Sequence, residues 1–147
     1  MTCYPSQTAN RPDAPDGRSR IRLRAEALLA KHGVSLEDMF GHAAVTEAGS
    51  ASPQSQTPQS AALATALMDV FRRSSDADVF DCLVQWVGPQ LYARVRSRLR
   101  SLGALYDPQE ILQDTFVNIY RYPDRFLASR PGAFAAWSST IVDNAIR

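Results

Sequence analysis

Residues 107–147 read DPQEILQDTFVNIYRYPDRFLASRPGAFAAWSSTIVDNAIR and decide the fold, because they encode two helices joined by an aromatic and basic loop. Asp107 is a typical helix N-cap, and Pro108 is well tolerated in the first turn. Glu110 follows the cap by three residues, which is the spacing of a capping box. A helix is therefore predicted to begin at this point of the chain.

Apolar residues recur at helical spacing on both sides of the loop. The first set is Leu112, Phe116, Ile119 and Tyr120, and the second is Phe134, Trp137, Ile141 and Ala145. Pro123 biases Tyr122 away from helical angles, so the first helix should end there. The second helix is predicted to continue to the last residue of the sequence.

A chain of 147 residues is long enough for one domain plus an extension. Its formal net charge is +1, so any surface for nucleic acid would have to be local. No signal peptide or long apolar run is present, which favours the cytoplasm and predicts no membrane insertion. Cys3 and Cys82 are too few for a disulfide framework and match no metal-site spacing.

Composition divides the chain into an extension, residues 1–57, and a domain, residues 58–147. Proline among polar residues predicts that residues 1–16 are disordered. Residues 17–41 favour a short helical hairpin, whose arginines are interpreted as a solvated face, with contact to nucleic acid or an acidic partner as the alternative. Ser, Gln and Pro dominate residues 49–59, which are predicted to be a linker.

Beyond the linker the pattern is helical throughout, and no alternation typical of strands occurs. Residues 61–73 form one apolar stripe, and Ser75 or Asp76 should start the next helix. Gly88 and Pro89 are expected to interrupt or kink that helix, because proline lacks the backbone donor. The predicted fold class is all-α, a compact bundle of about four main helices after a partly disordered N-terminal extension.

Catalysis is poorly supported by the sequence. His32 and His42 both precede the linker, and there is no glycine-rich phosphate loop or metal-ligand spacing. Glu110 and Asp114 share a helix face, but capping explains Glu110 better than acid–base chemistry does. We therefore expect no enzyme, no catalytic residues, no cofactor and no metal.

Binding is better supported, because aromatic residues alternate with arginines in the loop and last helix. These residues are Tyr120, Tyr122, Phe126, Phe134 and Trp137 with Arg121, Arg125 and Arg130. Rings of this kind can stack on unpaired bases while guanidinium groups hold phosphates. The alternative is that Phe134 and Trp137 are ordinary core residues at helical spacing.

Three segments in order carry a resemblance to a known family. They are GPQLYARVRSRL at 88–99, DPQEILQDTFVNIYR at 107–121, and the pattern F-x-x-W-x-x-x-I-x-x-N from Phe134 to Asn144. Together they resemble region 2 of bacterial sigma-70 family factors of the extracytoplasmic-function group. The resemblance implies a sigma region 2-like helical fold. The resemblance covers the chain from about Ala61 to its end.

The resemblance implies a transcription initiation module that binds RNA polymerase core through the beta-prime coiled coil. It then recognises and melts the promoter −10 element by holding the non-template strand. The implied polymerase-binding residues are Gln113, Asp114, Asn118 and Arg121. The implied DNA-binding residues are Arg125, Phe126, Arg130, Phe134, Trp137 and Asn144. An anti-sigma factor stays open as a further partner.

The chain departs from the family pattern after Trp137. Family members usually read Trp-Leu-Tyr-Arg-Ile-Ala, whereas residues 137–142 read WSSTIV, and Asp143 adds a negative charge. These features favour an alternative, a protein-interaction domain that keeps the fold and polymerase docking without promoter opening. The sequence stops inside the last helix with no domain for a −35 element, so we expect part of a longer factor or a reduced one.

Overall fold

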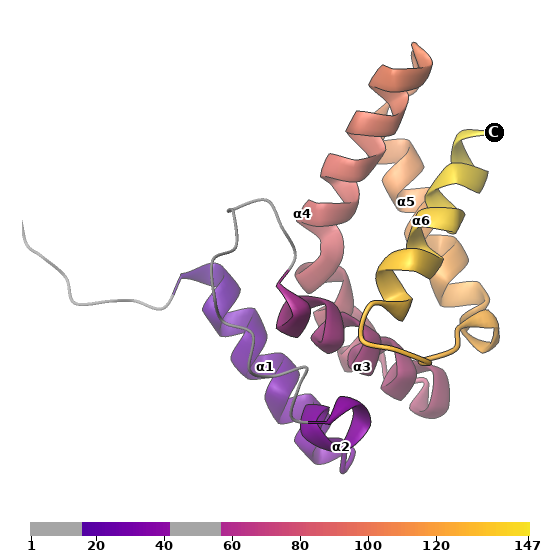
Figure 1. Cartoon of the computed structure of the whole chain (residues 1–147). Coiled ribbons are helices and arrows are strands. Elements are labelled where there is room, and N and C mark those ends of the chain that lie inside the picture. Colours follow the sequence, from indigo (N-terminus) through magenta and orange to yellow (C-terminus); the bar gives the residue numbers. More distant parts are fainter. Residues whose placement is uncertain (1–15, 42–56) are drawn as a thin grey trace, which may run out of the picture.

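The structure, a computed structural model, describes residues 16–41 and 57–147, and all its regular elements there are helical (Figure 1). They are α1 (Gly17–Lys31), α2 (Leu36–Phe40), α3 (Pro58–Ser74), α4 (Ala77–Leu102), α5 (Pro108–Arg121), the 3₁₀ turn η2 (Pro123–Arg125) and α6 (Ala133–Ile146). The all-α class predicted from the sequence is confirmed. The predicted disorder of residues 1–16 and most of the predicted linker lie outside the described residues.

Helix ends in the second half lie where the sequence placed them. The Asp107 carboxylate accepts a hydrogen bond from the Gln109 amide, with Pro108 at the start of α5. Tyr122 ends α5 with φ −124° and ψ 47°, as the following proline predicted. Gly103 ends α4 at φ +60°, a left-handed conformation that costs glycine little.

Helix α3 begins earlier than predicted. The Thr57 hydroxyl accepts a hydrogen bond from the Ser60 amide, and Pro58 occupies the first turn. The helix therefore includes the last residues of the segment 49–59 that composition assigned to the linker. Its start was missed because Ser60 and Ala61 carry no large apolar side chain, although a Thr-Pro pair is itself a start signal.

Helix α4 runs without interruption through Gly88 and Pro89, so of the two outcomes predicted at this pair, an interruption or a kink, the interruption does not occur. A proline removes one backbone hydrogen bond, but packing on both sides of it compensates. Val87 is 2% exposed and Leu91 is 5% exposed. Tertiary contacts therefore keep the helix continuous past a residue that would weaken it in isolation.

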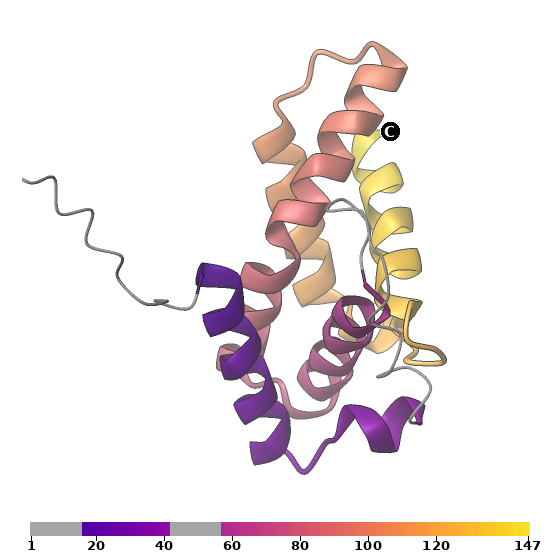
Figure 2. The ribbon, with the colours of Figure 1, turned by 60° about the vertical axis from the view of Figure 1, so that its left-hand side comes forward.

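The core lies where α3 meets the other helices. Helices α4, α5 and α6 run side by side, and α3 packs across the lower parts of α4 and α6 (Figures 1 and 2). Leu67 and Met68 of α3 are fully buried at this crossing, as is Leu83 of α4. Farther along α4, Leu91, Val95 and Leu99 are buried, whereas Leu102 near its end is 59% exposed.

Helix α1 packs on α3 and α4 and shares their core, on the side away from α6 (Figure 2). Ala25 is fully buried and Leu29 is 2% exposed. The Cys82 thiol of α4 lies 3.8 Å from the Ile21 carbonyl oxygen of α1. The domain boundary near residue 58 stays a prediction, but the helix that precedes it contributes to the same core.

Three of the four α1 arginines have partners within the chain. The Arg24 guanidinium lies 2.8 Å from an Asp81 carboxylate oxygen, and this hydrogen bond raises its pKa. Arg22 pairs with Glu26 at 3.0 Å, and the Arg18 guanidinium lies 4.6 Å from the Trp86 ring centroid. Arg18 and Arg22 are exposed and Arg24 is half-buried, and the contacts of Arg18 and Arg24 attach α1 to α4.

Candidate functional site

One side of α5 faces solvent and carries the residues predicted to bind polymerase. Gln113, Asp114 and Arg121 are exposed and Asn118 is half-buried. Val117 lies among them and is 45% exposed, so the surface has an apolar centre. An α-helix turns by 3.6 residues, which places all five on adjoining rows of one face. The structure therefore brings this predicted set together on one face of α5.

The buried side of α5 differs from the predicted apolar stripe. Ile111, Thr115 and Ile119 form its centre, and Thr115 is fully buried with its hydroxyl donating to the Ile111 carbonyl at 2.8 Å. Leu112 and Phe116 flank that line. The stripe was misplaced by about one residue because a threonine occupies its middle row.

Tyr120, predicted on the apolar face, is 57% exposed. Its ring still packs on two aromatic side chains, with centroid distances of 5.6 Å to Phe71 and 5.1 Å to Phe80. The ring thus covers the junction of α3 and α4 while one edge stays in solvent.

The loop after α5 is anchored by an aromatic cluster. Phe126 and Phe134 are each 2% exposed, and their ring centroids lie 6.3 Å apart. Trp137 is half-buried, 5.3 Å from Phe126 and 6.3 Å from Phe134. As placed, Phe126 and Phe134 present no open ring face, so packing is their visible role. Trp137 alone of the three has a partly accessible ring.

The polar members of the predicted DNA set are accessible. Arg125, Arg130 and Asn144 are all exposed. The Arg125 guanidinium lies 4.8 Å from the centroid of the Tyr122 ring, which is itself 46% exposed. A guanidinium stacked on tyrosine keeps its donors free at the edge of the ring. Tyr122 thereby presents an exposed aromatic surface beside a basic group.

Thr65 of α3 holds the start of α6 in place, which sequence reasoning missed. Its hydroxyl donates to the Pro131 carbonyl at 2.6 Å and accepts from the Phe134 amide at 3.2 Å. The side chain is fully buried. One hydroxyl thus satisfies two backbone groups at a helix start that has no side-chain cap. No sequence signal separates this threonine from an ordinary surface position.

The α6 residues that depart from the family pattern have structural partners. Ser138 is 1% exposed and its hydroxyl donates to the Ala135 carbonyl at 3.2 Å. Asp143 pairs with Arg98 of α4 at 2.8 Å, so its negative charge is matched within the chain. A small serine here permits α6 to approach α3 and α4 closely.

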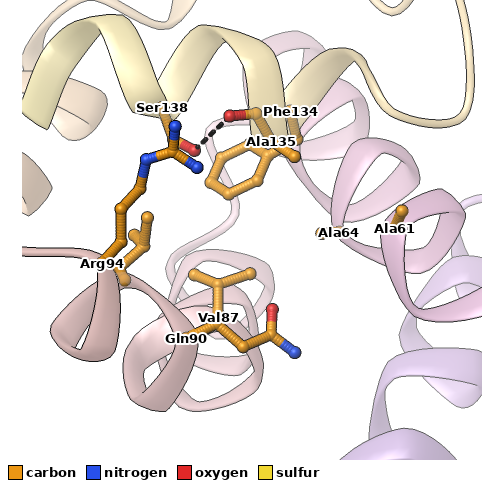
Figure 3. Close-up of a pocket in the computed structure, with 9 residues that line it drawn as sticks. Ala61, Ala64, Val87, Gln90, Arg94, Phe134, Ala135 and Ser138 are labelled. Carbon is orange, nitrogen blue, oxygen red and sulfur yellow. Dashed lines mark hydrogen bonds between the residues drawn. The ribbon is translucent and has the colours of Figure 1, made fainter. Parts of the chain in front are cut away.

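A pocket of about 60 Å³ lies between α3, α4 and α6. Its floor is apolar and includes Ala64, Val87 and Phe134, while Gln90, Arg94 and Ser138 bring polar groups to it (Figure 3). This volume holds about two water molecules and is far smaller than the several hundred Å³ of a typical ligand site. The pocket therefore does not by itself indicate a small-molecule substrate.

Residues 16–41 and 57–147 contain no group of three side chains that could hold a metal ion. No helix within those ranges is long and apolar enough to cross a membrane. The burial of Cys82 raises the pKa of its thiol, which opposes the reactive thiolate form.

Comparison with known protein families finds one family model that matches part of the chain. Residues 83–147 match the family model of Sigma-70 region 2. The matched segment is less than half of the chain and spans most of α4, all of α5 and η2, and α6. It is therefore similar to a domain of sigma-70 transcription initiation factors. No curated protein and no solved structure matches the chain.

Proposed function

We propose that this chain is a non-catalytic transcription initiation module that docks on RNA polymerase core and contacts single-stranded promoter DNA. The observation that carries the proposal is the match of residues 83–147 to Sigma-70 region 2. Two exposed surfaces within that segment support it: the outer face of α5 and the basic loop that follows. The cytoplasm is the compartment that the proposal requires.

Docking is assigned to the outer face of α5. Gln113, Asp114, Asn118 and Arg121 surround the exposed Val117. An apolar centre with a polar rim is typical of protein interfaces. The sequence resemblance names the beta-prime coiled coil as the partner of this helix. The extracytoplasmic-function group and an anti-sigma factor rest on the same resemblance and remain parts of the proposal.

DNA contact is assigned to a reduced set of the predicted residues. Arg125, Arg130 and Asn144 supply accessible donors, and Trp137 supplies a partly open ring. Phe126 and Phe134 support these residues from the core. A flipped base needs a stacking surface and hydrogen bonds to its edge, and Tyr122 adds such a surface beside Arg125.

The rival function is a protein-interaction domain that docks on polymerase without opening promoters. The residues that favoured it, Ser139, Thr140 and Asp143, remain the argument for it. Asp143 is now a weaker argument for the rival function, because its negative charge is paired with Arg98. The rival predicts docking with no preference for −10 sequences, which the second experiment below measures.

The first experiment tests docking with the paired change Gln113→Ala and Asp114→Ala. Both side chains point into solvent, so folding should be unchanged while affinity for the beta-prime coiled coil falls. Interface hot spots cost about 2 kcal/mol or more, which is roughly a thirtyfold loss of affinity. Glu37→Ala with Asp38→Ala on α2 is the matched control. Unchanged binding in the α5 variant, with unchanged circular dichroism, overturns the assignment.

The second experiment measures DNA readout in the complex with polymerase core. Fluorescent non-template oligonucleotides with a −10-like sequence should bind better than scrambled ones. Arg125→Ala should weaken binding and lower the salt slope by about 0.7, the value for one lost phosphate contact on a single strand. Arg20→Ala, an exposed arginine of α1, is the control. Docking without sequence preference, and without an effect of Arg125, would establish the rival function.

A further inference from the structure

The second half of α4 and the whole of α6 form a surface with only one side-chain carboxylate. Residues 88–102 contain four arginines and no Asp or Glu. Residues 133–147 contain a single acidic side chain, Asp143. The two helices lie side by side in this region (Figures 1 and 2). Such a concentration of positive charge suits a polyanion.

Two of these arginines are one helical turn apart and differ in their partners. Arg98 is bound to Asp143 through its Nε atom at 2.8 Å. No hydrogen bond or ion pair within the described ranges engages the Arg94 guanidinium, which extends from α4 toward Ser138 of α6 (Figure 3). One arginine of the pair is thus free and the other is occupied.

The Arg98–Asp143 pair is open to exchange. The side chains are 47% and 34% exposed, so water and ions reach both groups. Exposed ion pairs contribute little net stability, because solvation of the separated charges nearly matches their attraction. A phosphate placed between Arg94 and Arg98 would meet two guanidinium groups and could replace the carboxylate as the partner of Arg98.

We propose that Arg94 and Arg98 form a contact for the phosphodiester backbone of single-stranded DNA, and that Asp143 competes with phosphate for Arg98. The inference rests on the proposed function and extends its DNA surface from the loop after α5 onto α4. Asp143 thereby sets the affinity for the strand: it neutralises one of two guanidinium groups until DNA displaces it. Asn144, the residue after Asp143 on α6, is also exposed, so one DNA strand could contact both Arg98 and Asn144.

The charge change defines the expected magnitude. Asp143→Asn frees Arg98 and adds about one phosphate contact, which steepens the salt slope for single strands by about 0.7. At about 0.1 M salt one such contact corresponds to roughly fivefold tighter binding. Arg94→Ala removes a contact and should weaken binding by a similar factor. Arg98→Ala leaves Asp143 unbalanced and should also weaken it.

The test uses the full chain and a fluorescein-labelled oligodeoxynucleotide, followed by anisotropy from about 50 to 200 mM salt. The variants are Asp143→Asn, Arg94→Ala, Arg98→Ala and the double change Asp143→Asn with Arg98→Ala. The double variant removes a neutral pair and should match the wild type. Glu37→Gln, the same charge change on exposed α2, is the control and should have no effect. Circular dichroism confirms folding of each.

The outcomes separate this inference from the function on which it rests. Tighter binding by Asp143→Asn, with the double variant near wild type, supports competition at Arg98. Salt-dependent binding by the wild type that Asp143→Asn leaves unchanged overturns the inference and keeps the DNA-binding function. If Glu37→Gln tightens DNA binding as much as Asp143→Asn does, the change in net charge alone explains the result, and the inference is also overturned. Absence of binding by wild type and Asp143→Asn alike overturns the inference, whereas the DNA-binding function is decided by the experiment in the complex with polymerase core.

Discussion

Replacing Leu29 by alanine should destabilise the whole helical unit, because this α1 side chain lies in the core shared with α3 and α4. Leu29 is only 2% exposed. Leucine-to-alanine changes at such positions cost about 3 to 5 kcal/mol, from lost transfer energy and the cavity left behind. Since α1 is packed on one side only, we expect the lower figure, about 3 kcal/mol. For a folded unit of this size that lowers Tm by roughly 12 °C.

Leu23→Ala provides a matched control on the same helix. Leu23 is 62% exposed, so the same chemical change should alter the free energy of unfolding by no more than about 0.5 kcal/mol. Urea unfolding is followed by circular dichroism and by tryptophan fluorescence. Trp86 lies beneath Arg18 of α1, whereas Trp137 lies on α6, so the two rings report on opposite sides of the molecule.

The decisive comparison is between the two tryptophans, measured separately in single-tryptophan variants. A shared core requires Leu29→Ala to move the transition at both Trp86 and Trp137. An unchanged transition at Trp137, with only circular dichroism at low urea affected, would mean that α1 unfolds separately. That result would refute the shared core and restore an independent domain beginning near residue 58.

Three further predictions concern buried or paired polar groups. Thr65→Val keeps the side-chain volume but leaves two buried backbone groups unpaired, so we expect a loss of about 1 to 3 kcal/mol in urea unfolding, with Ser139→Ala as a milder control. Cys82 should react slowly with a thiol reagent in the folded chain, measured in a Cys3→Ser background that removes the other thiol. Leu29→Ala should speed the labelling of Cys82. Equal labelling rates with and without Leu29→Ala would contradict the burial of Cys82 under α1. The hydrogen bond from His32 lowers the Asp76 pKa, so the stability it contributes is complete above its ordinary value of 3.8 and is lost as the pH falls through the lowered value. Asp76→Asn should flatten this acid limb, and an unchanged limb would contradict the linkage.

Local signals predicted the helices well. Asp107 and Pro108 marked the start of α5, and Pro123 marked its end, because caps and prolines act through backbone groups a few residues away. The interruption predicted as one outcome at Pro89 does not occur, for the complementary reason. Its local cost is real, but burial of neighbouring residues on α4 outweighs it, and no sequence pattern reveals packing of that kind.

The site was less predictable, because exposure depends on partners distant in the chain. Spacing selected Phe134 and Trp137 equally, yet one is buried and the other is partly open. Asp143 read as an isolated negative charge, although Arg98, forty-five positions earlier, balances it. The outer face of α5 needed no such information, since it is simply the side without large apolar residues apart from Val117.

The packing of α1 against α4 has a kinetic consequence. The contact from Ile21 to Cys82 closes a loop of 61 residues, and that from Arg24 to Asp81 closes one of 57. Contacts between helices adjacent in sequence, such as α4 and α5, close much shorter loops and cost less chain entropy. The nucleus for folding should therefore form among the later helices, with α1 joining after the main barrier. During synthesis α1 leaves the ribosome before α4 and must wait for it, so the face of α1 that later becomes buried is exposed to other proteins throughout that interval.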